Sequence, residues 1–126
     1  MPVTLPPHCV PILRVHDAQA SAAYYQTALG WSTNWEHQAE PTQPRFVSIQ
    51  FHQATLFLSE HGGDGALRTH VYLYIDDVDA HYRWCHDRGA RIIEPPENKP
   101  WGVREMRIQD LDNNELRFGT RLAETT

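Results

Sequence analysis

Residues 11–30 read PILRVHDAQASAAYYQTALG and place a strand, a helix cap, a helix and a stop in direct succession. Residues 9–15 are rich in aliphatic and β-branched side chains, which is typical of a strand. Asp17 stands at an N-cap position, residues 18–29 are strong helix formers, and Gly30 ends the run. The segment predicts a strand followed by an amphipathic helix.

The same order recurs about 60 residues later in the chain. Residues 70–75 are strand-like, Asp76-Asp77 cap a helix that reaches about residue 88, and Gly89 stops it. Three further strand-like segments follow each helix, at residues 31–36, 45–51 and 55–60 and at residues 91–94, 103–109 and 115–119. We therefore predict an α+β fold in one domain, residues 1–126, built from two duplicated modules at about residues 8–61 and 68–120.

The composition restricts the function classes. The 126 residues carry a net charge of −5, which argues against a nucleic-acid partner because such proteins present a basic surface. No apolar run approaches the roughly 20 residues of a membrane span, and residues 1–7 lack the features of a secretory signal. We expect a cytoplasmic protein without a membrane partner, with Cys9 and Cys85 as buried free thiols in a reducing compartment.

Alternation within the strands separates two sides of the predicted sheets. Val47 and Ile49 face one way, whereas Phe46 and Ser48 face the other. The second side combines aromatic, hydroxyl, amide and charged groups, which favours a ligand-facing cavity over the alternative of a solvated face. The same alternation places three cations on this side: Arg14, Arg107 and Arg117.

Three segments of the chain are distinctive: PILRVHD at residues 11–17, PWGVRE at residues 100–105 and DLDNNELRFG at residues 110–119. They resemble the vicinal oxygen chelate superfamily, which includes glyoxalases, bleomycin resistance proteins and dioxygenases. The chain looks most similar to the bleomycin resistance proteins. The resemblance implies two βαβββ modules whose mixed sheets form a cup, usually in a homodimer.

Metalloenzymes of this superfamily hold their ion at four positions, and the resemblance maps these onto Val10, Phe57, His70 and Arg117. Neither valine nor phenylalanine can donate to a metal, and arginine repels it, whereas a functional site needs at least three protein ligands. We therefore expect no metal, no other cofactor and no catalytic residue. A register slip could bring His8 back, but His8 and His70 would still make only two ligands. A metal-dependent enzyme of the glyoxalase or dioxygenase type stays the alternative.

The other histidines and the smaller candidate sites have simpler interpretations. Glu60-His61 with His70 could form a small metal cluster, but a solvated loop is favoured because neighbouring strand residues point to opposite sides. His81 and His86 are five residues apart and are predicted to lie at the surface or in a dimer contact. Cys85 is predicted to be packed and not reactive.

The aromatic residues suggest a binding function. The resemblance places Trp101 and Phe46 where bleomycin resistance proteins present rings to the flat part of the drug, and Trp31 is predicted to be core. The predicted ligand-binding residues are Phe46, Trp101, Trp35, Phe57, Ser48, His70, Tyr72, Gly102, Glu105 and Arg117.

A negative rim would attract a cationic drug. The candidate rim residues are Glu36, Glu40, Glu60, Asp64 and Glu105. We expect non-catalytic binding and sequestration of a bleomycin-family glycopeptide antibiotic, which would confer resistance. The alternatives are the metal-dependent enzyme and a binder of another flat small molecule, since stacking aromatic rings recognise many ligands.

Overall fold

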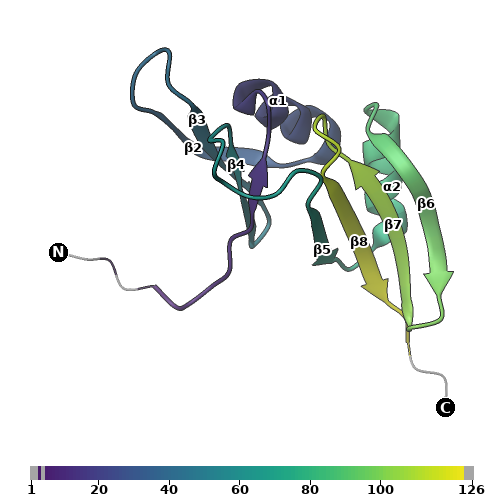
Figure 1. Cartoon of the computed structure of the whole chain (residues 1–126). Coiled ribbons are helices and arrows are strands. Elements are labelled where there is room, and N and C mark those ends of the chain that lie inside the picture. Colours follow the sequence, from purple (N-terminus) through teal and green to yellow (C-terminus); the bar gives the residue numbers. More distant parts are fainter. Residues whose placement is uncertain (1–2, 4, 124–126) are drawn as a thin grey trace.

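The computed structural model describes residue 3 and residues 5–123 and contains two modules with the same order of elements (Figure 1). The first module consists of β1 (Ile12–Arg14), α1 (Ala18–Leu29), β2 (Ser32–Gln38), β3 (Arg45–Phe51) and β4 (Ala54–Ser59). The second consists of β5 (His70–Tyr74), α2 (Val78–Asp87), β6 (Arg91–Lys99), β7 (Val103–Gln109) and β8 (Glu115–Arg121). The predicted α+β fold with two βαβββ modules is confirmed.

Each module forms one mixed four-stranded sheet. Sheet A has the strand order β1-β4-β3-β2 and sheet B has the order β5-β8-β7-β6. In both sheets the first strand pairs in parallel with the last, and the other pairs are antiparallel. The first strand of each module is therefore a sheet edge, and so is the strand that follows each helix.

The helix ends follow the sequence signals. Asp17 and Asp77 each accept a hydrogen bond from the backbone N–H three residues later, at 3.0 Å in both cases. Gly30 ends α1 in the left-handed conformation, with φ of 84°, which glycine adopts without strain. In α2 the C-cap is Arg88, and Gly89 follows it with a φ of 80°. The aspartate cap and the left-handed glycine thus recur in both modules.

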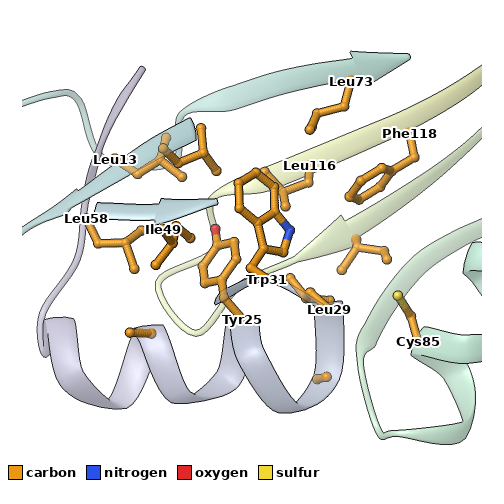
Figure 2. Close-up of a cluster of buried hydrophobic side chains, with 14 of the residues drawn as sticks. Leu13, Tyr25, Leu29, Trp31, Ile49, Leu58, Leu73, Cys85, Leu116 and Phe118 are labelled. Atoms are coloured by element: carbon orange, nitrogen blue, oxygen red, sulfur yellow. The ribbon is translucent and has the colours of Figure 1, made fainter. Parts of the chain in front are cut away.

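One hydrophobic core joins the two modules. Leu13, Ile49 and Leu58 of the first module and Leu116 and Phe118 of the second belong to the same buried cluster (Figure 2). Trp31 is only 2% exposed, which confirms its predicted place in the core. Its ring contacts Tyr25 in an edge-on arrangement, with the ring centroids 5.8 Å apart.

Two sequence predictions about the fold are wrong. Cys9 is exposed, because β1 begins only at Ile12 and Cys9 lies in the extended segment before it. β6 continues through Pro95-Pro96 to Lys99, whereas the sequence predicted a strand only at residues 91–94. An edge strand tolerates proline, and register shifts between Ile92 and Glu97 absorb the missing donors. Among the described residues, no helix has the length and apolar character needed to cross a bilayer.

Candidate functional site

Sheet A presents a cluster of rings from three adjacent strands. Trp35 of β2 stacks on Phe46 of β3 with a centroid distance of 5.9 Å, and Phe57 of β4 lies 5.0 Å from Phe46 and 5.5 Å from Trp35. His61 contacts the edge of this group at 6.3 Å from Phe46. Trp35 is 47% exposed. We call Trp35, Phe46, Phe57 and His61 the aromatic wall, and three of its members are predicted binding residues.

The polar groups around the aromatic wall are mostly engaged within the protein. Ser48 is buried, and its hydroxyl accepts a hydrogen bond from the Asn34 side chain at 3.2 Å. The Glu60 carboxylate accepts from the backbone N–H groups of Ala18 and Arg45, at 2.8 and 3.0 Å. Asp64 accepts from the Ser59 hydroxyl at 2.8 Å. The exposed carboxylates of the predicted rim near this sheet are those of Glu36 and Glu40.

Trp101 lies in the turn between β6 and β7, where Gly102 has a φ of 86°. Its side chain is 64% exposed, in agreement with the exposure predicted from its flanking Pro100 and Gly102. The β6–β7 turn lies at the lower right of Figure 1, whereas β2 and β3 lie at the upper left. One chain therefore does not bring Trp101 and Phe46 together.

Sheet B carries a charged network on the side predicted to face the ligand. The buried carboxylate of Glu115 accepts hydrogen bonds from Arg107, at 3.0 and 2.7 Å, and from Arg117 at 2.8 Å. His70 Nδ1 lies 3.8 Å from the same carboxylate. Burial alone would raise the pKa of Glu115, but the two guanidinium groups lower it to about 2. Glu115 is therefore ionised at neutral pH and fixes both arginines.

Tyr72 reaches across β8 to a buried carboxylate on β7. Its hydroxyl donates to Glu105 Oε1 at 2.9 Å, and Glu105 is 2% exposed. Burial and this hydrogen bond raise the pKa of Tyr72 to about 12. The ring crosses β8 at Gly119, where a Cβ atom would lie 2.1 Å from the Tyr72 hydroxyl. Gly119 is therefore required for this hydrogen bond.

Replacing Gly119 with alanine should expel the Tyr72 ring, because Cβ would also lie 2.8 Å from the ring carbon Cζ. We expect the pKa of Tyr72 to fall from about 12 toward 10.0, and the free energy of unfolding to fall by about 1–2 kcal/mol. Tyrosinate absorbance during a pH titration measures the first effect. Gly63→Ala is the matched control, since nothing lies within 4 Å of its Cβ position. An unchanged tyrosine titration in Gly119→Ala would contradict this account.

A hollow of about 1070 Å³ lies between the modules. It is lined by the β3–β4 turn, by β5 and by the first turns of α2, and aromatic side chains of Phe51, Tyr72, Tyr74 and Trp84 contribute to it. His81 also lines it, with its ring centroid 4.9 Å from Phe51. Of these residues, only Tyr72 was predicted to bind a ligand.

His81 was predicted to lie at the surface or in a dimer contact, and within one chain its side chain is partly buried. Its ring contacts Phe118 with a centroid distance of 4.7 Å, and its Nε2 lies 3.4 Å from the Cys85 sulfur. Burial lowers the pKa of His81 to about 4 and raises the pKa of the Cys85 thiol to about 12. Cys85 is packed, as predicted, and its reactive thiolate form is disfavoured.

A family model described as "Glyoxalase superfamily protein" matches residues 4–124. The chain belongs to the glyoxalase superfamily. This match confirms the resemblance seen in the sequence. No curated protein in the comparison matches the chain.

Several solved structures share the fold. TioX from Micromonospora sp. ML1 superposes with a TM-score of 0.80 at 22% identity, over 93% of this chain and 100% of that one. A bleomycin-binding protein complexed with bleomycin gives 0.74 at 25% identity, over 92% and 99%. Glyoxalase I from Zea mays gives 0.74 at 18% identity, over 90% of this chain and 44% of that one. The neighbours thus include both binding proteins and an enzyme.

The residues present do not fit the divalent metal that glyoxalase-superfamily enzymes hold. At the mapped positions, Phe57 is part of the aromatic wall, and Arg117 is paired with Glu115. The guanidinium groups of Arg107 and Arg117 pair with the Glu115 carboxylate beside His70, and their positive charge repels a metal ion. Within residue 3 and residues 5–123, no three His, Cys, Asp or Glu side chains are arranged to hold a metal.

Proposed function

We propose that this protein binds a flat, cationic small molecule of the bleomycin family and sequesters it without chemical turnover. The observation that carries the proposal is the aromatic wall, because an exposed Trp35 stacks on the half-buried Phe46 and the half-buried Phe57 lies tilted against both rings. The net charge of −5 favours a cationic ligand. The similarity to a protein complexed with bleomycin supports the same ligand class.

The binding unit in this proposal is a homodimer in the cytoplasm. Trp101 and the aromatic wall lie far apart in one chain, so both can contact one ligand only if a second copy supplies one of them. The wall of one subunit would then face Trp101, Gly102 and the charged network of its partner. Lowering the free drug concentration in this way would confer resistance.

Titration with copper-bound bleomycin tests the proposal, with tryptophan fluorescence and calorimetry as readouts. We expect saturable, stoichiometric binding at micromolar protein, weakened about tenfold or more in Trp35→Ala and in Trp101→Ala, because each removes a stacking ring. Trp84→Phe is the matched control, since Trp84 lies on α2 away from the aromatic wall, and it should bind normally. Absence of saturable binding by the natural sequence would refute the proposed function.

Mixing the two variants tests the dimer. A mixed dimer of Trp35→Ala and Trp101→Ala subunits contains one site with an intact wall and an intact Trp101, so some full-affinity sites should reappear. If no such sites reappear although subunits exchange, both rings do not belong to one intersubunit site.

Two measurements separate the proposal from its alternatives. Elemental analysis of protein purified without chelator would favour the metal-dependent enzyme if it found near-stoichiometric metal. Growth on bleomycin with and without expression distinguishes a drug-binding protein from a binder of another flat molecule, because only the first protects the cells.

A further inference from the structure

The hollow between the modules has a chemical character of its own. Its lining includes the exposed faces of Tyr72 and Tyr74 and the side chains of Asp76 and Asp77, whereas none of the described residues that line it is lysine or arginine. None of its lining residues belongs to the aromatic wall. The volume of about 1070 Å³ is ample for a small ligand, because such pockets usually measure about 300–1000 Å³.

The two tyrosine rings are arranged as an electron-rich surface. Tyr72 and Tyr74 lie 5.0 Å apart between centroids, and both remain partly exposed. The Tyr72 hydroxyl donates a hydrogen bond to the buried Glu105 carboxylate, which increases the negative character of the phenol. A negative ring face attracts cations. Glu105 thus acts as a positioning residue that also polarises the ring.

One cation of the protein already uses this surface. The guanidinium carbon of Arg121 lies 4.8 Å from the centroid of Tyr74. Arg121 follows Thr120 on β8 and is exposed, so its position on the ring is not forced by burial. This contact shows that the ring face of Tyr74 accepts a guanidinium group in the fold as it stands.

We propose that the hollow between the modules binds a small organic cation of the alkylammonium class, held against Tyr72 and Tyr74 and by the carboxylate of Asp76. Asp76 is exposed and has no hydrogen-bond or ion-pair partner among the described residues, so its charge is available to a ligand. Asp77 is less available, because it caps α2 through the backbone N–H of Ala80. The site goes beyond the proposed function, since it is complete in one chain and does not use the aromatic wall.

Choline is the probe, and its neutral carbon analogue, in which a tert-butyl group replaces trimethylammonium, is the control ligand. Calorimetry or broadening of the N-methyl proton signal should show choline binding in the millimolar range. The neutral analogue should bind about tenfold more weakly, because it lacks the charge that the rings and Asp76 recognise. Equal binding of the two ligands, or no choline binding, would overturn the proposal.

Two variants should change choline binding in opposite directions, and two others should leave it unchanged. Asp76→Asn should weaken choline binding about threefold, and Arg121→Gln should strengthen it about threefold by freeing one face of Tyr74 and removing a repelling charge. Tyr82→Leu is the control, because Tyr82 contacts His86 outside the hollow and should leave binding unchanged. Weaker binding in Arg121→Gln would overturn the proposal. Trp35→Ala should bind choline normally, because Trp35 belongs to the aromatic wall and not to the hollow. Choline binding by the hollow and bleomycin binding by the aromatic wall can therefore succeed or fail independently.

Discussion

Replacing Asp110 with alanine is expected to lower the free energy of unfolding by about 3–4 kcal/mol. The carboxylate is fully buried and accepts four hydrogen bonds. They come from the Tyr25 hydroxyl at 2.9 Å, the backbone of Asp112 at 2.8 Å, and the backbone and side chain of Asn114 at 2.9 and 3.0 Å. Alanine would leave these buried donors unsatisfied, which costs more than the hydrogen bonds contribute.

The size of this effect follows from the place of Asp110 in the fold. Tyr25 belongs to α1 in the first module, and Asn114 donates from its side chain to the Arg14 carbonyl of β1 at 3.1 Å. Burial raises the pKa of Asp110, and the hydrogen bonds offset part of that cost. The variant should therefore loosen the junction between the modules as well as the turn before β8.

Urea unfolding followed by far-ultraviolet circular dichroism measures this effect. Tyr25→Phe removes only one of the four hydrogen bonds and should cost about 1–2 kcal/mol. Asp110→Asn keeps the shape and should fall between the two. If Asp110→Ala is no less stable than Tyr25→Phe, the carboxylate does not hold the modules together in the way described.

The fold could be predicted because its signals are local and occur twice. Asp17 and Gly30 bound α1, and Asp77 caps α2, at the positions expected from the sequence. Alternation likewise placed Phe46 and Phe57 on the same side of sheet A, where their rings meet. Residue type and spacing were sufficient in these cases, since each feature depends on neighbours within one strand, helix or hairpin.

The rest of the candidate site depends on contacts between segments far apart in the chain. The hydrogen bond from Tyr72 to Glu105 passes over Gly119 and needs the register of three strands. His81 was predicted to lie at the surface or in a dimer contact, because helix spacing alone cannot show that Phe51 of the other module packs against its ring. The pairing of Glu115 with Arg107 likewise depends on the β7–β8 register, whereas Arg117 lies two residues from Glu115 on the same strand.

The protein should become less stable as the pH falls from 6.5 toward 4, and His81 should cause most of that loss. Burial of the ring lowers the pKa of His81 from 6.5 to about 4, so between these values the unfolded chain binds a proton that the folded chain does not. The contribution of His81 to stability is therefore fully present above pH 6.5 and is lost progressively as the pH falls to about 4. Below about pH 4 this residue causes no further change. We expect a loss of about 2 kcal/mol, less than the full shift implies, because the ring also borders the open hollow.

Urea unfolding at several pH values, compared with His81→Phe, isolates this effect. Phenylalanine retains an aromatic ring beside Phe51 and Phe118 but cannot take up a proton, so its stability should vary much less across the window. His86→Gln is the matched control on the same helix, and it should keep the natural pH dependence because the His86 side chain is exposed.

Glu115 does not confuse the comparison, since its pKa of about 2 places its contribution below pH 4.5. The raised pKa of Asp110 changes the stability in the opposite direction as the pH falls. Asp110 is present in all three proteins, so its contribution cancels when their pH profiles are compared. A pH profile of His81→Phe that parallels the natural protein would assign the acid sensitivity to another group.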